Sequence, residues 1–231
     1  MSETMKGVFV TFEGGEGAGK STHIAFLARC LRELGREVLC LREPGGTSIG
    51  EDLRAIVLDP KNDAMCDQAE LLIYEAARAQ IVAQVIAPAL QRGAVVLCDR
   101  FYDSTVAYQA YGRGLSRQFV DACSAFACQG VEPNRTILMV SATAEEGLAR
   151  ATQEGADRLE LAGVDFHARV NQAFLDIAAQ QPQRVRVVHF AERKAETARR
   201  VFSQVVDVID GLQEAIDADP TYFERIEEPA E

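Results

Sequence analysis

Residues 7–35 read GVFVTFEGGEGAGKSTHIAFLARCLRELG. The stretch opens with a short apolar run, residues 7–12, that is typical of a buried strand. It closes with residues 21–34, whose apolar spacing predicts a helix that ends at Gly35. Between the two lies GGEGAGKS, which fits the pattern GxxxxGK[ST]. In a strand–loop–helix context this pattern lets backbone N–H groups surround an anion, so the sequence predicts a site for a nucleoside triphosphate.

Within this loop, each residue type has an expected role. Lys20 is expected to reach the outer phosphates, and the Ser21 hydroxyl to ligate Mg²⁺. Asp99, which ends a later apolar run, is expected to be the second Mg²⁺ anchor, through water. The alternative is an Asp99–Arg100 ion pair at a strand end with no ligand. The residues expected to hold the nucleotide are Gly14, Gly15, Glu16, Gly17, Ala18, Gly19, Lys20, Ser21 and Thr22.

Four more apolar runs follow, and segments of helical spacing separate them. The runs are residues 37–41, 94–98, 136–140 and 186–190, and the helical segments are residues 49–58, 68–90, 117–129 and 165–180. Links of helix length indicate parallel strands. We therefore predict a doubly wound α/β domain of the P-loop NTPase type, with a mainly parallel five-stranded sheet and helices on both faces. All five strands are expected to be buried on both faces, and the polar residues at their ends to meet at one edge.

The composition excludes several classes of protein. The 231 residues include 24 Lys and Arg against 35 Asp and Glu, a net charge of −11, which argues against broad nucleic-acid binding. No apolar run approaches the roughly 20 residues that a membrane span needs. Six cysteines with no CxxC pair are expected to be reduced thiols in the cytoplasm.

The acidic residues concentrate at the C-terminus. Residues 213–231 contain seven acids and one Arg. We therefore divide the chain into a domain of residues 1–213 and an acidic extension of residues 214–231. Residues 217–231 are expected to be solvated, with docking of a helical turn through Tyr222, Phe223 and Ile226 as the alternative.

Two further segments carry candidate functional residues. In residues 70–80, ELLIYEAARAQ, Tyr74 and Arg78 lie on one helical stripe. A ring that stacks on a base and a guanidinium one turn away would make a nucleotide pocket, whereas the alternative is a core Tyr and a surface Arg. Residues 141–163 are polar and look like a mobile lid, where Arg150 and Arg158 would close over phosphates. A surface helical hairpin is the alternative there.

Five strings in this order and spacing resemble the thymidylate kinases, from about Val8 to about Gln213. They are FEGGEGAGKST, LREPGGT, LLIYEAARAQ, DRFYDSTVAYQAYGRG and GLARATQEGADRLE. The resemblance implies transfer of the γ-phosphoryl of ATP to dTMP with Mg²⁺, which supplies dTTP for DNA synthesis, by a homodimer that packs its long helices together. The rival hypotheses are a kinase for another nucleoside monophosphate and a GTP-binding switch. The switch usually needs an NKxD string, which is absent.

The resemblance also implies roles for individual residues. Arg100 would hold the dTMP phosphate, Tyr74 would stack on thymine, and Arg78 would bind its carbonyl. Tyr108 would occupy the place of a ribose 2′-hydroxyl. The residues that would bind the substrate are Glu16, Glu43, Pro44, Tyr74, Arg78, Arg100, Thr105, Tyr108 and Gln109.

The catalytic cations are the point where the sequence departs from its relatives. The phosphate loop carries no Arg. Family members without an Arg in this loop usually carry several in the lid, but here Thr152 and Glu154 stand at lid positions where Arg is typical. The expected catalytic residues are therefore Lys20, Arg100, Arg158 and, as second choice in the lid, Arg150.

Overall fold

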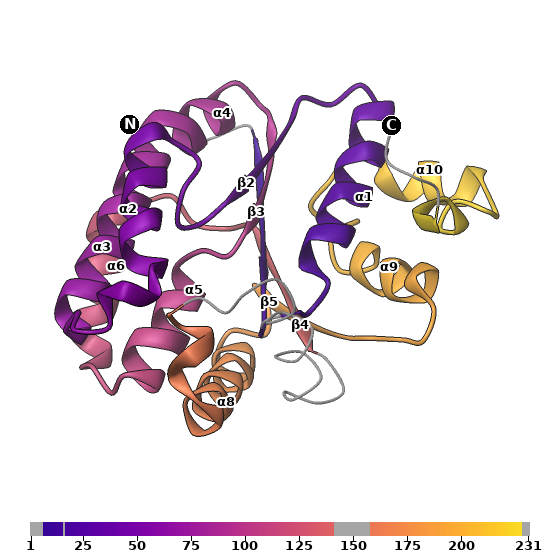
Figure 1. Ribbon diagram of the computed structural model, residues 1–231. Coiled ribbons are helices and arrows are strands. Elements are labelled where there is room, and N and C mark those ends of the chain that lie inside the picture. Colours follow the sequence, from indigo (N-terminus) through magenta and orange to yellow (C-terminus); the bar gives the residue numbers. More distant parts are fainter. Residues whose placement is uncertain (1–6, 16, 141–157, 228–231) are drawn as a thin grey trace.

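The computed structural model describes residues 7–15, 17–140 and 158–227, and its centre is one parallel sheet (Figure 1). The strands are β1 (Val8–Glu13), β2 (Val38–Arg42), β3 (Val95–Asp99), β4 (Arg135–Val140) and β5 (Val185–His189). They lie in the order β2-β3-β1-β4-β5, and every neighbouring pair is parallel. The predicted doubly wound, five-stranded sheet is confirmed, and all of its strands are parallel.

Helices cover both faces of the sheet, as predicted (Figure 1). Helices α1, α9 and α10 lie on one face, and the others lie on the opposite face. The helices are α1 (Lys20–Glu33), α2 (Ser48–Leu58), α3 (Asp67–Ile81), α4 (Ala87–Gln91), α5 (Tyr102–Thr105), α6 (Arg117–Cys128), α8 (Val164–Gln180), α9 (Lys194–Phe202) and α10 (Leu212–Ala218). Short 3₁₀ turns span Pro60–Asn62, Glu160–Ala162 and Glu224–Glu227.

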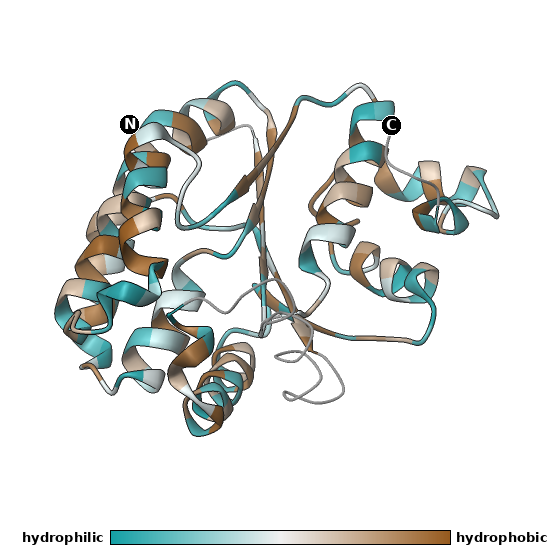
Figure 2. Ribbon diagram, in the orientation of Figure 1, coloured by the Kyte–Doolittle hydropathy of each residue, from teal (hydrophilic) through white to brown (hydrophobic). Residues whose placement is uncertain are grey.

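Burial of the strands depends on their place in the sheet. In the central strand β1, Phe9, Val10 and Phe12 are completely buried, and Figure 2 shows the sheet interior as hydrophobic. At the two edges, Cys40 of β2 is exposed and Val187 of β5 is 37% exposed. The prediction that all five strands are buried on both faces is therefore wrong for β2 and β5, because an edge strand has a neighbour on one side only.

The helix predicted over residues 68–90 is divided into three parts. A π-helical turn, Val82–Ile86, separates α3 from α4. Pro88 lies at the start of α4, where it has no N–H to donate to the preceding turn and its ring crowds the carbonyl of Gln84. A wider turn relieves that crowding, which accounts for the break.

The helical segment that follows β3 is among those that were not predicted from the sequence. Residues 102–105 form α5, and a π-helical turn continues it over Val106–Gly112. Six residues of that turn are buried, so it has no polar face to give the sequence a helical period.

The C-terminal segment packs against the domain instead of extending into solvent. Tyr222, Phe223 and Ile226 are 5%, 4% and 8% exposed, and they belong to the same core as Phe26 and Phe202. The prediction of a solvated extension is wrong for residues 217–227, and the docking alternative is right. Apolar burial of this kind outweighs the repulsion of the neighbouring acids, because Glu224 and Glu227 stay at the surface and pair with Arg193 and Lys194.

The contacts of this segment reach two helices. Arg225 forms an ion pair with Glu33 of α1 at 2.5 Å, and Arg29 of α1 donates to the backbone carbonyl of Arg225. Glu224 pairs with Arg193 at 2.6 Å, just before α9. The C-terminal segment is therefore fastened to the helix that follows the phosphate loop.

Most of the predicted lid, residues 141–157, lies outside the described residues, and Arg150 lies there too. Its last part, residues 158–163, is described as a turn and a short 3₁₀ helix. Among the described helices, none combines the length and the apolar character that crossing a membrane requires.

Candidate active site

The phosphate loop joins β1 to α1 at the carboxyl end of the parallel strands, where the sequence predicts the ligand site. β1 pairs with β3 in a register that places Phe12 beside Asp99, so this loop and the Asp99–Arg100 pair meet there. Gly14 has a φ of +130°, and a Cβ at this position would lie 2.2 Å from the carbonyl oxygen of Met139. Only glycine fits such a place.

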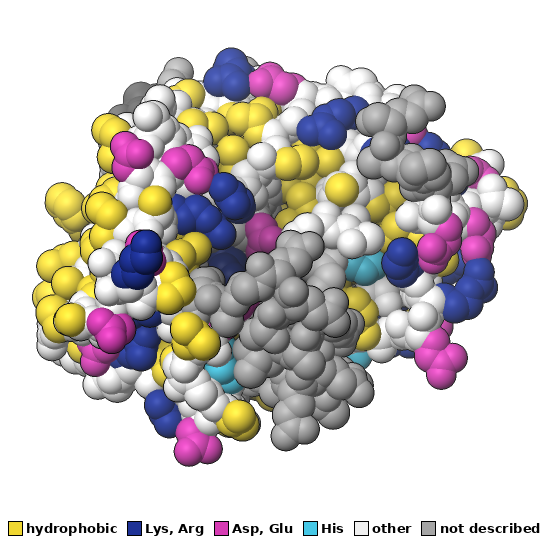
Figure 3. All heavy atoms as spheres, viewed as in Figure 1, with side chains coloured by type: hydrophobic (Ala, Val, Ile, Leu, Met, Phe, Trp, Pro, Cys, Tyr) yellow, Lys and Arg dark blue, Asp and Glu magenta, His cyan; other side chains and the backbone are white. Residues whose placement is uncertain are grey.

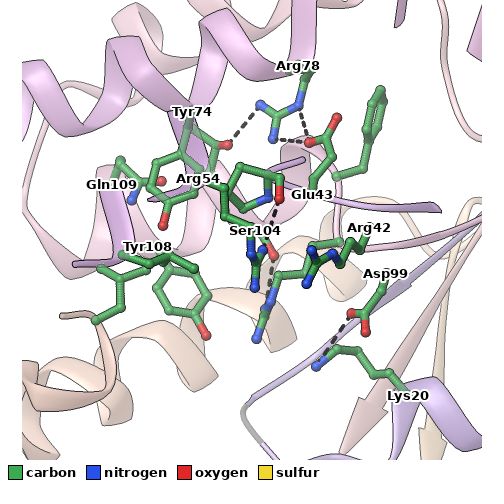
Figure 4. A pocket seen from close by; sticks show the side chains of 16 residues that line it. Lys20, Arg42, Glu43, Arg54, Tyr74, Arg78, Asp99, Ser104, Tyr108 and Gln109 are labelled. Atoms are coloured by element: carbon green, nitrogen blue, oxygen red, sulfur yellow. Dashed lines mark hydrogen bonds and ion pairs between the residues drawn. The ribbon is translucent and has the colours of Figure 1, made fainter. Parts of the chain in front are cut away.

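Lys20 begins α1 and its side chain turns back over the loop. Its ammonium donates to the carbonyls of Gly14 at 3.4 Å and Gly15 at 3.2 Å, and it is 6% exposed. It also lies 3.9 Å from Asp99 Oδ1 (Figure 4). An ammonium held in this way lies at the N-terminus of a helix, where phosphates are favoured.

Ser21 and Asp99 come together as the magnesium prediction requires. The Ser21 hydroxyl donates to Asp99 Oδ2 at 3.4 Å, and Asp99 Oδ1 is buried without a hydrogen-bond partner among the described residues. Hydroxyl and carboxylate oxygens are the ligands that Mg²⁺ prefers. The residues present therefore fit the ion.

Beside the loop lies a cavity of about 170 Å³, and Figure 3 shows Lys and Arg side chains gathered around a hollow on this face of the molecule. The cavity is where the predicted residues meet. Those that line it are Lys20, Glu43, Pro44, Tyr74, Arg78, Asp99, Arg100, Thr105, Tyr108 and Gln109. The residues predicted from the sequence therefore meet in one cavity, although they come from four separate parts of the chain.

Arg100 lies between the loop and the cavity. Its guanidinium donates to the carbonyl of Gly14 and to the Ser104 hydroxyl, both at 3.1 Å, and lies 5.2 Å from the centre of the Tyr108 ring. Its backbone has a φ of +70°, which non-glycine residues rarely adopt. Such strain is common where a side chain must point in one direction for function.

Arg78 lines the cavity and is 2% exposed. It donates to Glu43 at 2.8 Å and to both Glu75 and Thr105 at 2.9 Å. Burial raises the pKa of Glu43 to about 7, although Arg78 lowers it. The surface-charge alternative for Arg78 is wrong, because this guanidinium is buried among carboxylates.

Tyr74 also lines the cavity and is 9% exposed (Figure 4). It follows Glu70 by one turn on α3, and the same helix carries Arg78. The predicted stripe of Tyr74 and Arg78 is therefore present, and both residues reach the same cavity.

Several residues in and around the cavity were not predicted from the sequence, among them Arg54, Ser104 and Glu13. Arg54 of α2 lines it and donates to the carbonyl of Pro44 at 2.9 Å. Ser104 donates to Glu13 Oε2 at 2.5 Å, and Glu13 also accepts from the backbone N–H of Phe101 at 2.8 Å. Burial, reinforced by nearby Asp103, raises the pKa of Glu13 to about 7. A Glu at the end of a buried strand, directly before the phosphate loop, was the available signal for this residue.

The described part of the cavity does not test the roles predicted for Arg158 and Glu16. Arg158 is not among the residues that line it; its guanidinium pairs with Glu70 and donates to the carbonyl of Val57 at 2.9 Å. Its catalytic role stays a prediction, as does that of Arg150. Glu16 lies outside the described residues, so its predicted contact with the sugar also stays a prediction.

The fold and the loop together define the class of protein. A parallel sheet whose first strand runs through GGEGAGKS into a helix, with Lys20 over the loop, is that of a P-loop nucleoside triphosphate-binding protein.

Comparison with known proteins identifies the family. The thymidylate kinase family model matches residues 12–201. The thymidylate kinase of Trichlorobacter lovleyi is 43% identical over 206 residues, which cover 86% of this chain and 97% of that protein. The thymidylate kinase of Pseudomonas entomophila is 46% identical over 207 residues, covering 89% and 98%. The crystal structure of thymidylate kinase from Ehrlichia chaffeensis matches with a TM-score of 0.71 and 29% identity, over 85% of this chain and 97% of that one.

The chain belongs to the thymidylate kinase family. It phosphorylates dTMP to dTDP with ATP as the phosphate donor. The rival assignment to a GTP-binding switch is thereby excluded.

Proposed function

We propose that the cavity is the dTMP site and that the phosphate loop holds ATP beside it. The observation that carries this proposal is that Lys20 and Asp99 line one part of the cavity while Tyr74 and Arg78 line another. A monophosphate bound there would present its phosphate to the loop. A coupled ADP-release assay over a panel of nucleoside monophosphates tests it, because ADP formation should depend on added dTMP.

Charge neutralisation is the main contribution that this site would make to the reaction. Transfer brings two polyanions together, and it needs positioning and positive charge more than covalent help. Arg100 is proposed to hold the dTMP phosphate and Lys20 to meet the outer phosphates of ATP. The strained backbone and the hydrogen bonds of Arg100 to Gly14 and Ser104 keep its guanidinium between the two. The acceptor phosphate is ionised near pH 7, so no general base is required.

Magnesium is proposed as the cofactor, with Ser21 as a direct ligand and Asp99 as an anchor through water. When bound there, the ion would neutralise charge on the β- and γ-phosphates. The support is the pair of oxygens described above, with Asp99 Oδ1 lacking a hydrogen bond among the described residues.

The proposed stacking of Tyr74 on thymine has a direct test. Tyr74→Ala is expected to raise KM for dTMP by roughly tenfold to a hundredfold while KM for ATP changes little, because stacking on a base contributes about 1–3 kcal/mol. Steady-state kinetics with each substrate varied in turn would measure this. Tyr74→Phe keeps the ring and is the matched control. Equal increases for both substrates would show that Tyr74 only supports the core.

The chain is also proposed to work as a homodimer, through a surface on α3 and α6. Leu72 is 56% exposed, Phe119 is 54% exposed and Phe126 is 85% exposed. Figure 3 shows hydrophobic side chains gathered along the edge where Figure 1 places these helices. A second copy of the chain is the proposed partner, since the two long helices would bury one another's apolar side chains.

Phe126→Glu tests this dimer. The variant is expected to run as a monomer at micromolar concentration, because a charge in an apolar interface lacks a partner. Size-exclusion chromatography with light scattering measures the mass. Leu175→Glu on α8, where Leu175 is 40% exposed, is the control and should stay dimeric. A monomeric wild-type protein would contradict the proposal.

We propose that the enzyme acts in the cytoplasm, where ATP is available. All six cysteines are free thiols, which suits a reducing compartment.

A further inference from the structure

Glu70 is a fully buried carboxylate that the activity described so far does not use. It lies on α3 one turn before Tyr74, is 0% exposed, and does not line the cavity. Three side chains from distant parts of the chain donate to it. They are Gln109 at 2.8 Å, Arg113 at 2.9 Å and Arg158.

The arginines hold this carboxylate in its ionised form. Burial by itself raises the pKa of Glu70, but the hydrogen bonds from Arg113, Gln109 and Arg158 outweigh it, and the pKa is lower than the ordinary value. Arg113 approaches with two nitrogens, at 3.2 Å and 2.9 Å, in the fork geometry that suits a carboxylate.

An ionised carboxylate accepts hydrogen bonds and cannot donate them. Gln109 must therefore turn its NH₂ group toward Glu70, and this points the carbonyl oxygen of the amide, Oε1, away from Glu70. Among the described residues, none donates a hydrogen bond to Gln109 Oε1, and Gln109 lines the cavity beside Tyr74 (Figure 4). The amide thus offers a carbonyl oxygen, an acceptor, to whatever base the cavity holds.

Arg78 lines the same cavity and offers the opposite chemistry, because a guanidinium can only donate. A donor from Arg78 and an acceptor from Gln109 match a pyrimidine whose edge shows a carbonyl oxygen next to an N–H, as thymine and uracil do. Cytosine shows an amino group next to a bare ring nitrogen, so it presents the reverse pattern.

We propose that Glu70 is a positioning residue for base specificity, which fixes the amide of Gln109 with its acceptor toward the base and so favours thymine over cytosine. The inference rests on the proposed use of this cavity as the dTMP site.

Glu70→Gln is the test, because it keeps the shape of the side chain and changes its hydrogen-bonding capacity. Arg113 and Arg158 only donate, so the oxygen of the new amide is expected to stay with them and its NH₂ to face Gln109. Gln109 would then reverse and present its own NH₂ to the base. The ratio of kcat/KM for dTMP to that for dCMP is expected to fall at least about tenfold, since unpaired buried polar groups are a strong source of discrimination.

A matched control lies one turn earlier on α3. Asp67 is 3.6 Å from Arg113 but has no contact with Gln109 among the described residues, so Asp67→Asn should leave the dTMP to dCMP ratio unchanged. General damage to the pocket would lower both kcat/KM values together and keep their ratio. An unchanged ratio in a folded Glu70→Gln enzyme overturns the inference.

A second variant covers the case in which Glu70→Gln does not fold. Gln109→Met keeps the length of the side chain, removes both polar ends and leaves Glu70 with its two arginines; the same fall in the ratio is expected, and a wild-type ratio overturns the inference. The proposed dTMP site is tested separately by Tyr74→Ala and by the dTMP-dependence of ADP release in the wild-type enzyme. Those results can support the site while the Glu70 variants contradict the role of Glu70.

Discussion

Lys20→Ala is expected to lower kcat for dTMP phosphorylation by at least about a thousandfold. The ammonium is held over the phosphate loop by the carbonyls of Gly14 and Gly15, at the N-terminus of α1. No other cation among the described residues donates to both of these carbonyls, and removal of a positioned charge at a phosphoryl-transfer site has effects of this order.

Single-turnover measurements at saturating ATP and dTMP would show this loss as a slower transfer step, and Lys61→Ala is the control. Lys61 is exposed in the Pro60–Asn62 turn and does not line the cavity, so its removal should leave the rate unchanged. Thermal unfolding of both variants should resemble that of the wild-type protein. A Lys20→Ala enzyme that keeps its transfer rate would mean that the loop does not hold the reacting phosphates.

Removal of residues 220–231 is expected to destabilise the folded state by several kcal/mol. Tyr222, Phe223 and Ile226 are all buried, and each such side chain contributes about 1.5–3 kcal/mol. The sum is comparable with the roughly 5–15 kcal/mol by which whole domains are stable. The truncated chain should unfold at a much lower urea concentration, if it folds at all.

Two point variants separate the effect of burial from the effect of chain length. Phe223→Ala should cost about 3–5 kcal/mol in the free energy of unfolding, and Phe223→Leu should cost less. Thr221→Ala is the control, because Thr221 is exposed on the same segment. Urea unfolding followed by circular dichroism measures all of them. Wild-type stability of the truncated chain would show that the segment does not contribute to the core.

Much of the fold could be predicted because local patterns determine it. The helix-length links between the apolar runs predict a parallel sheet, and the structure has that sheet. The prediction that the C-terminal segment is solvated is wrong because it rests on the number of acidic residues. Burial of Tyr222 and Phe223 depends instead on partners near the other end of the chain. Composition carries no information about such distant contacts.

The residues of the site likewise divide into those that local patterns predict and those that depend on distant contacts. Tyr74 and Arg78 were found because helical spacing places them on one stripe, and motif residues such as Arg100 follow a strand end. Glu70 was not predicted because its proposed role depends on its contacts with Gln109 and Arg158, which are 39 and 88 residues away in sequence.

The docking of the C-terminal segment on α1 bears on how the chain is made. Arg29 donates to the carbonyl of Arg225 although 196 residues separate them, so α1 stays partly uncovered until residues 222–226 have been synthesised. Until those residues emerge, a nascent chain carries its complete phosphate loop on a helix whose aromatic surface at Phe26 is not yet covered by Tyr222 and Phe223. Such surfaces are prone to aggregate. A chain that stops before residue 222 would contain every described cavity residue but would lack part of its hydrophobic core.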